Sequence, residues 1–241
     1  MKYARLLFFA FAISGAGGIT AAKGQTTDEI IQKHIIAIGG ADNWKKINSI
    51  KKNCVRNSRG VEIPVTITVL QGKGYKTENT VNGMTGYTII TDKAGWNYNP
   101  RGGQKADVIP EDAVKQAQDR LDIQGPLIDY KTKGNKVINL GKDDVEGTEC
   151  YKLKVTLPSG KEETIFIDAS SYYLVRTVEK IKANGKEQVQ TATYGDYEKL
   201  PEGIIYPMSM DGAGSMTIKS IEINKPVDEQ IFKPEEPHSS R

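Results

Sequence analysis

The stretch Val61-Glu62-Ile63-Pro64-Val65-Thr66-Ile67-Thr68-Val69 decides the fold of this 241-residue chain. Its apolar side chains occupy every second position, with polar residues or proline between them. Successive side chains of a β-strand point to opposite faces, so this alternation indicates a strand with one buried face. Pro64 has no backbone N–H to donate, which predicts that the strand lies at a sheet edge or contains a bulge.

The same alternation continues on both sides of this strand, beginning near Ser49. Turn-forming residues separate the segments: Asn82-Gly83, Pro158-Ser159-Gly160 and Ala183-Asn184-Gly185 are examples. Long strands joined by tight turns predict an antiparallel sheet. The further strands are expected at residues 73–80, 84–91, 94–98, 135–140, 148–157, 161–168, 171–182, 187–197, 203–211 and 215–224.

Three helical segments interrupt the strands. Residues 27–38 carry an apolar stripe, and Thr26 and Glu29 have the spacing of a capping box at its start. A short helix is expected over residues 42–47 and another over residues 110–122. An apolar sheet face is unfavourable in water, so we expect the helices to cover it. The predicted fold class is mainly β (α+β), an open or curved antiparallel sheet covered by helices.

The N-terminus has the pattern of a secretory signal. Within residues 1–24, a short basic segment precedes an apolar run at residues 6–13, and Ala22-Lys23-Gly24 places small residues at a cleavage site. The apolar run is shorter than the roughly 20 residues that span a bilayer, which favours cleavage before Gln25 over an uncleaved anchor. No cysteine stands near this site to accept a lipid. We therefore expect an exported, soluble, periplasmic protein.

Removal of the signal changes the charge balance. Residues 1–24 contain three of the 33 basic residues and no acid, so 30 basic residues remain against 30 acidic ones. The signs are interspersed, whereas nucleic-acid binding requires clustered positive charge. The remaining length suits one β-rich domain over residues 25–234, followed by a disordered tail at residues 235–241.

Two cysteines, Cys54 and Cys150, both lie in predicted strands. An oxidising compartment would permit a disulfide between them. Such a bond needs Cα atoms within about 7 Å of each other, which the sequence does not establish. Cys150 falls on the polar phase of its strand, opposite to Leu153. A disulfide and two free thiols therefore both remain open.

No catalytic or metal-binding pattern is present in the sequence. Its two histidines, His34 and His238, form no metal-ligand spacing with each other or with a cysteine, and His34 is expected to be a partly buried helix residue. Glu162-Glu163 point to opposite faces of a strand and cannot face each other as glycosidase carboxylates do. Gly212-Ala213-Gly214-Ser215 stands between strands, which favours a hairpin turn over a phosphate loop. We predict that the protein is not an enzyme and holds no cofactor or metal.

Three motifs together carry a resemblance to a known family. Residues 89–100, IITDKAGWNYNP, resemble the strand–turn–strand of the LolA-like outer-membrane lipoprotein carriers, in which a "D-G-x" turn precedes "W-x-Y-x-P". Residues 203–207, GIIYP, resemble a recurring "dG-x-x-x-P" strand of that family, and residues 221–232 resemble its C-terminal segment. Where family carriers commonly have Arg followed by Pro on an early strand, residues 71–75 read QGKGY.

The resemblance implies an incomplete antiparallel β-barrel whose concave face is covered by helices. It also implies a hydrophobic cavity that accepts the acyl chains of lipoproteins in the periplasm. Each buried methylene would contribute about 0.8 kcal/mol, and methionines would adapt to variable acyl shapes. The predicted cavity-lining residues are Val65, Ile67, Val69, Trp96, Tyr98, Leu153, Val155, Phe166, Met208 and Met210.

Two functions follow as hypotheses. The first is a non-catalytic periplasmic carrier whose ligand is a lipid or the acyl chains of a lipoprotein. The alternative is a periplasmic sensor or scaffold of the same fold, which binds a protein partner such as a membrane-associated protein. The alternative predicts a filled core and an exposed apolar patch on the outer sheet face.

Overall fold

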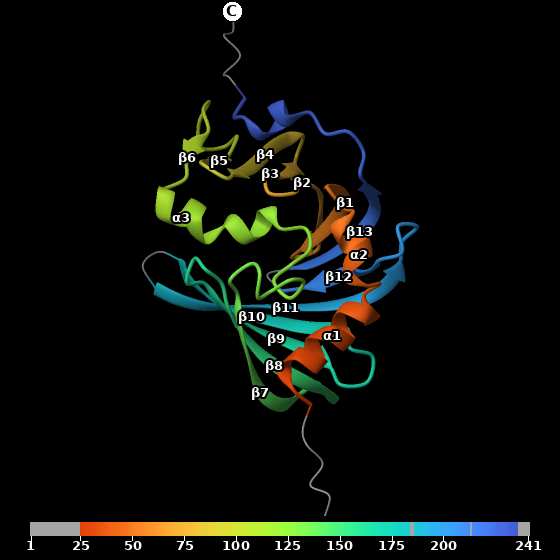
Figure 1. Ribbon diagram of the computed structural model, residues 1–241. Coiled ribbons are helices and arrows are strands. Elements are labelled where there is room, and N and C mark those ends of the chain that lie inside the picture. Colours follow the sequence, from red (N-terminus) through yellow and green to blue (C-terminus); the bar gives the residue numbers. More distant parts are fainter. Residues whose placement is uncertain (1–24, 184–185, 213, 236–241) are drawn as a thin grey trace, which may run out of the picture.

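A single bent sheet of 13 antiparallel strands forms the molecule (Figure 1). The computed structural model describes residues 25–183, 186–212 and 214–235. The spatial order of the strands is β6-β5-β4-β3-β2-β1-β13-β12-β11-β10-β9-β8-β7, so the sheet ends at β6 and β7 and does not close. The predicted incomplete antiparallel barrel is thus confirmed. The strands are β1 (Ser49–Ser58), β2 (Val61–Leu70), β3 (Gly74–Val81), β4 (Met84–Thr91), β5 (Gly95–Tyr98), β6 (Asp107–Val108), β7 (Lys136–Val145), β8 (Thr148–Thr156), β9 (Glu162–Asp168), β10 (Leu174–Ala183), β11 (Lys186–Lys199), β12 (Ile205–Asp211) and β13 (Ser215–Ile223).

The strand order determines where the connecting segment must run. Strands β1 to β6 follow one another outward to one edge, and β7 to β13 return from the other edge to pair with β1. Residues 109–135 connect the two edges and therefore cross an open face of the sheet. Figure 1 shows α3, part of this crossover, between the β3–β6 region and the β10–β11 region. We call residues 109–135 the cover.

The helices begin and end close to the predicted positions. Glu29 N–H donates to Thr26 Oγ1 over 3.2 Å and Thr26 N–H donates to Glu29 Oε2 over 2.8 Å, so the predicted capping box is present. In the part of the chain that the structure describes, no helix is long and apolar enough to cross a bilayer. The helical elements are α1 (Thr27–Ala37), α2 (Ala41–Lys45), α3 (Glu111–Gln116) and the 3₁₀ turns η1 (Gln118–Leu121) and η2 (Glu229–Phe232).

One large apolar cluster, the main core, lies on the concave face, which is the face that α1 and the cover occupy. It joins the buried side of α1 to alternate residues of β1, β2, β8 and β9. Its fully buried members fill the space that an open sheet would otherwise expose to water. The buried residues of the main core are Ile30, Ile31, Ile35, Ile38, Trp44, Ile47, Ile50, Cys54, Val65, Ile67, Val69, Leu127, Ile128, Tyr151, Leu153, Val155, Ile165, Ile167, Ile204 and Ile223.

The opposite, convex face carries two smaller apolar clusters. In one, Phe232 of η2 packs on Tyr87 and Ile89 of β4. In the other, Cys150 and Phe166 pack with neighbouring valines of β7 and β10. Both faces of the sheet are therefore partly apolar.

Several features of the strands differ from the sequence-based expectation. Strand β2 is an interior strand paired with β1 and β3, although Pro64 favoured an edge or a bulge. The β3 ladder begins only at Val65, so Pro64 lies in a part of β2 with one free side. The two-residue strand β6 was not expected, because it carries no alternation. The predicted signal at residues 1–24 lies outside the described residues, as does the predicted tail at residues 235–241 apart from Glu235.

Candidate ligand site on the concave face

The cover is attached firmly to the β2–β4 side of the concave face. Val114 and Leu121 pack on Ile90, with Tyr75 beside them. Gly72 N–H donates to the Leu121 carbonyl over 2.9 Å. These contacts bury apolar side chains and satisfy backbone groups on the same side of the cover, so this side is its fixed attachment.

On its opposite side, the cover is joined to β10 by ion pairs of Lys161. Lys161 Nζ lies 2.8 Å from Asp119 Oδ2 in η1 and 2.7 Å from Glu179 Oε2 in β10. The Lys161 side chain is only 17% exposed, so solvent screens this ion-pair network less than an exposed pair. Gln116 Nε2 also donates to the Ser159 carbonyl over 3.0 Å. We call Lys161, Asp119 and Glu179 the latch.

A cavity of about 420 Å³ opens beside the latch. It lies between η1, the later part of the cover and the β8–β9 turn, and carboxylates, amides and a lysine line it together with Pro126, Leu157 and Pro158. Its accessible wall is nevertheless more apolar than polar, so the cavity combines apolar surface with titratable groups. Its lining residues are Gln71, Gln118, Asp119, Asp122, Gly125, Pro126, Lys133, Asn135, Leu157, Pro158, Ser159 and Glu163.

Among the groups that line this cavity, the Glu163 carboxyl has a strongly raised pKa. Burial raises the pKa of its carboxyl to about 7, and Asp119 and Glu179 act in the same direction against the opposing effect of Lys161. A carboxyl with this pKa exchanges its proton near neutrality. Protonation of Glu163 therefore changes the charge next to the latch in the neutral range.

We expect Glu163→Gln to remove a pH dependence of stability. The raised pKa of Glu163 means that the folded state binds its proton more tightly than the unfolded state, whose pKa is near 4.3. This contribution is complete below about pH 4 and is lost as the pH rises to about 7, which lowers the free energy of unfolding by about 1–3 kcal/mol. Urea unfolding from pH 5 to pH 8 should show this decline in the wild type and a flatter profile in the variant. Equal profiles would mean that Glu163 titrates normally.

Partly exposed side chains line the concave face beyond the main core. Met216 packs against this core, Met210 pairs with Met216 across β12 and β13, and Tyr194 pairs with Met210 across β11. Directly paired residues of an antiparallel ladder share a face, so the three form one row. Each is half-buried. We call Tyr194, Met210 and Met216 the methionine row.

The helices leave the methionine row accessible. On the concave face, η1 packs against β2, β3 and β4, α1 packs over the main core and beside β7, and the latch contacts β10 from the rim of the cover. The same face of the sheet is thus filled under α1 but only partly covered across β11–β13. This difference locates the space for a ligand.

The structure brings most of the predicted lining residues to the concave face. Five of these are fully integrated into the main core, and Met208 and Met210 are half-buried in β12. Those on the concave face are Val65, Ile67, Val69, Leu153, Val155, Met208 and Met210.

The remaining three predicted residues, Trp96, Tyr98 and Phe166, lie on the convex face. Trp96 pairs with Ile89 and Tyr98 pairs with Tyr87, so both rings join the cluster under η2. Phe166 joins the cluster of Cys150 instead, because Ile165 and Ile167 on either side of it take the concave positions. Their strands thus direct these rings away from the concave site.

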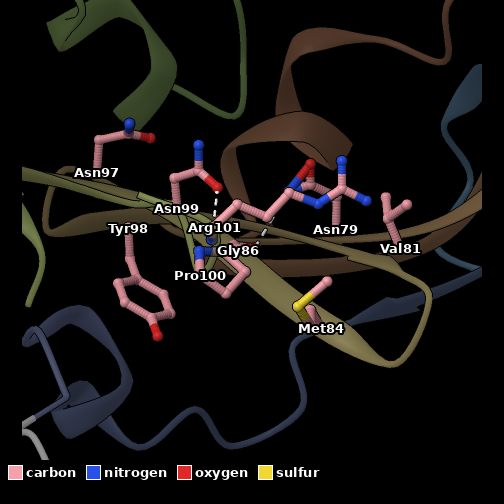
Figure 2. Close-up of a pocket in the computed structure, with 9 residues that line it drawn as sticks. All are labelled: Asn79, Val81, Met84, Gly86, Asn97, Tyr98, Asn99, Pro100 and Arg101. Carbon is pink, nitrogen blue, oxygen red and sulfur yellow. Dashed lines mark hydrogen bonds between the residues drawn. The ribbon is translucent and has the colours of Figure 1, made fainter. Parts of the chain in front are cut away.

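A second cavity of about 350 Å³ lies at the far end of β3, β4 and β5 (Figure 2). Its wall is rich in polar groups, including Asn79, Asn97 and Arg101. Figure 2 shows that Tyr98 points away from Asn97, to the opposite side of β5. The cavity therefore lacks the apolar wall that an acyl chain requires.

The described residues contain no group of three or more metal-ligating side chains. His34 Nδ1 lies 2.8 Å from the Tyr172 carbonyl oxygen, and burial lowers the pKa of this imidazole. It is a neutral, packed helix residue, as the sequence indicated.

The two cysteines are free and lie on opposite faces of the sheet. Cys54 belongs to the main core, whereas Cys150 lies in the convex cluster with Phe166. Burial, followed by the nearby Asp168 carboxylate, raises the pKa of the Cys150 thiol to about 11. The alternative left open by the sequence is thus resolved in favour of two free thiols.

Sequence reasoning missed three residues that border this site: Tyr194, Met216 and Lys161. Met216 stands two residues before Ile218, as expected for two apolar residues on one face of a strand, and this was an available signal. Tyr194 and Lys161 become recognisable only from the strand register and from the path of the cover. Long-range pairing of this kind leaves no local pattern.

Comparison with known proteins supports the fold. No family model matches the chain, and no curated protein matches its sequence. A LolA superfamily protein from Nitrosomonas europaea superposes with a TM-score of 0.56 at 11% identity, over 87% of this chain and 98% of that chain. A proposed outer membrane lipoprotein-sorting protein domain from Vibrio parahaemolyticus gives a TM-score of 0.52 at 14% identity, over 85% of this chain and 94% of that chain. The chain therefore has a LolA-like fold.

Proposed function

We propose that this chain is an exported, non-catalytic carrier that binds the acyl chains of a lipoprotein, or another lipid, on its concave face. The observation that carries the proposal is the methionine row, which is apolar, lies on the concave face and is only half-buried. The LolA-like fold and the signal-like residues 1–24 support a periplasmic place of action.

The energetics favour an acyl chain as the ligand of this row. Burying one methylene contributes about 0.8 kcal/mol, so ten give a gross gain of roughly 8 kcal/mol before ordering costs. Methionine side chains have three flexible bonds and a polarizable sulfur, so they adapt to chains of different shape. An aromatic ring at Tyr194 adds apolar area at the end of the row.

The attachment of the cover suggests how a ligand enters and leaves. Val114 and Leu121 pack α3 and η1 on β4, the latch ties η1 to β10, and Leu127 and Ile128 anchor the later part of the cover in the main core. Release of the latch breaks ion pairs but leaves both of these apolar attachments intact. The latch meets β10 at Glu179, two residues from Thr177, whose hydroxyl lies 3.3 Å from that of Tyr194 in the methionine row. Release of the latch would therefore widen access to that end of the row.

We expect the protein to bind an uncharged fluorescent acyl probe, the methyl ester of a pyrene-labelled fatty acid. Met210→Glu should weaken this binding at least tenfold, because a carboxylate in the row loses its water when the chain binds. The measurement is fluorescence titration of delipidated protein.

The control for this test is Ile138→Glu, which adds the same charge at a side chain that is 56% exposed on the edge strand β7. This variant should bind the probe as the wild type does. Absence of probe binding in the wild type, or equal loss in both variants, would contradict a ligand site at the methionine row.

A protein partner is the second candidate, and the edge strand β7 favours it. Ile138 and Leu140 are 56% and 51% exposed there, and one side of β7 pairs with no described strand. An exposed sheet edge can accept a strand from another chain. A protein that worked only in this way would not take up the acyl probe, so the same titration separates the two functions.

A further inference from the structure

We propose that the lipid held on the concave face carries an anionic group, a carboxylate or a phosphate, and that Arg56 binds it. This inference rests on the proposed carrier function and specifies its ligand class. The proposed function requires only an acyl chain, whereas this inference adds a charged group at one end of that chain.

The strand register places Arg56 at the end of the methionine row. Arg56 pairs with Met216 of β13 on one side and with Ile63 of β2 on the other. Cys54, two residues earlier in β1, belongs to the main core, so Arg56 shares its concave face. The cross-strand order is therefore Tyr194, Met210, Met216 and Arg56, an apolar row that ends in a guanidinium group.

The guanidinium of Arg56 is incompletely paired. Its Nε is shielded from solvent and has no hydrogen-bond partner among the described residues. No carboxylate in the described ranges lies within 4 Å of it. Buried donors in folded proteins nearly always have a partner, and an unsatisfied charged donor is unfavourable. An anion at this position would satisfy the donor.

A second cation, Lys52, lies on the same strand as Arg56 and adds positive charge to the β1 side of the concave face. Lys52 lies on the concave phase of β1, and its Nζ donates to the Tyr206 hydroxyl over 3.1 Å, 5.5 Å from the ring centroid. No described carboxylate forms an ion pair with it. On the opposite side of the concave face, Asp119 and Glu179 are already engaged by the latch lysine, and Glu163 lies beside them in the adjoining cavity. The β1 wall is thus positive.

The chemistry of arginine identifies the group that fits. A guanidinium presents a planar set of N–H donors that matches the oxygens of a carboxylate or a phosphate. With such a head group at Arg56, an attached chain would extend over Met216 and Met210 toward Tyr194. The ligand class is an amphiphile with one terminal anion and a long apolar chain.

The test compares a pyrene-labelled fatty acid with its methyl ester at pH 8, where the acid is ionised and the chain is the same. Removing a hydrogen bond to a charged group costs enough to change affinity about tenfold or more, so the wild type should prefer the acid by that factor. Arg56→Gln should bring the acid-to-ester affinity ratio close to one. Arg56→Lys keeps the positive charge but lacks the planar set of guanidinium donors, so it should retain part of the preference for the acid.

The matched control is Lys51→Gln. Lys51 neighbours Lys52 on β1 but is exposed on the opposite face of the strand, and its loss changes the net charge equally. This variant should keep the wild-type preference for the acid. Thermal unfolding of each variant verifies that it is folded before titration.

Further arms identify the source of the anion. A long-chain alkyl phosphate that displaces the labelled acid shows that a phosphate head group is accepted, whereas displacement by inorganic phosphate alone would overturn the requirement for a chain. Equal wild-type affinity for acid and ester, or an unchanged preference in Arg56→Gln, would overturn the role of Arg56 and leave the carrier function intact. Failure to bind either probe would overturn both.

Discussion

Gly39→Ala is expected to lower the free energy of unfolding by at least about 3 kcal/mol. Gly39 has a φ of +104°, which side chains rarely adopt, and it follows α1 at a close contact with another segment. A Cβ atom there would lie 2.3 Å from the Gly203 carbonyl oxygen and 2.7 Å from Ile204 Cα. Both are backbone atoms and cannot rotate away. Urea-induced unfolding followed by circular dichroism measures the loss.

Gly60→Ala separates the two causes of this effect. Gly60 has a similar positive φ of +80°, but nothing lies within 4 Å of its potential Cβ. We expect this control to cost only about 1 kcal/mol, the conformational part alone. Equal losses in the two variants would show that the contact between Gly39 and Gly203 is not close in solution.

The position of Gly39 connects this stability effect to the ligand site. Just before it, the Ile38 carbonyl accepts hydrogen bonds from Ile205 N–H and Trp44 Nε1, both over 2.9 Å. This junction holds the end of α1 against the start of β12, the strand that carries Met210. Acyl-probe affinity should therefore fall together with stability in Gly39→Ala.

Leu153→Ala is expected to cost about 2–5 kcal/mol, the range for removing a large side chain from a filled core. Leu153 is 0% exposed and packs within the main core of the concave face. Met210→Ala should cost less than about 1.5 kcal/mol, because the half-buried side chain loses fewer contacts. Chemical unfolding of the two variants in the same buffer gives both values.

The pair of variants tests the division of the concave face into a filled part and an accessible part. Acyl-probe binding should persist in Leu153→Ala under conditions where the variant is folded, but should weaken in Met210→Ala. A cost at Met210 as large as that at Leu153 would mean that the methionine row is ordinary core, and the ligand site would be lost with it.

Local patterns predicted the strands well because alternation depends on neighbouring residues. Residues 61–69 alternate and form β2, and the capping box at Thr26 starts α1 where expected. The alternation of apolar and polar residues does not show which side of a strand faces the cover. Trp96 and Phe166 are apolar residues in strands, yet they lie on the convex face, which has apolar clusters of its own. Only the register across the sheet distinguishes the two faces.

The site was less predictable than the fold for a related reason. The methionine row joins residues from β11, β12 and β13, and Arg56 joins it only because β1 pairs with β13 near the other end of the chain. The latch likewise depends on the path of the cover between two sheet edges. Sequence spacing contains no direct record of such contacts between distant segments.

Cys54 and Cys150 lie on opposite faces of the sheet and on strands that are far apart in it, which has a consequence for how the chain folds. Neither thiol can reach the other in the folded state, so folding requires no oxidation step and no disulfide catalyst. The unfolded chain should regain the same structure at the same rate under reducing and mildly oxidising conditions. The stability of this fold therefore does not depend on the redox state of its surroundings.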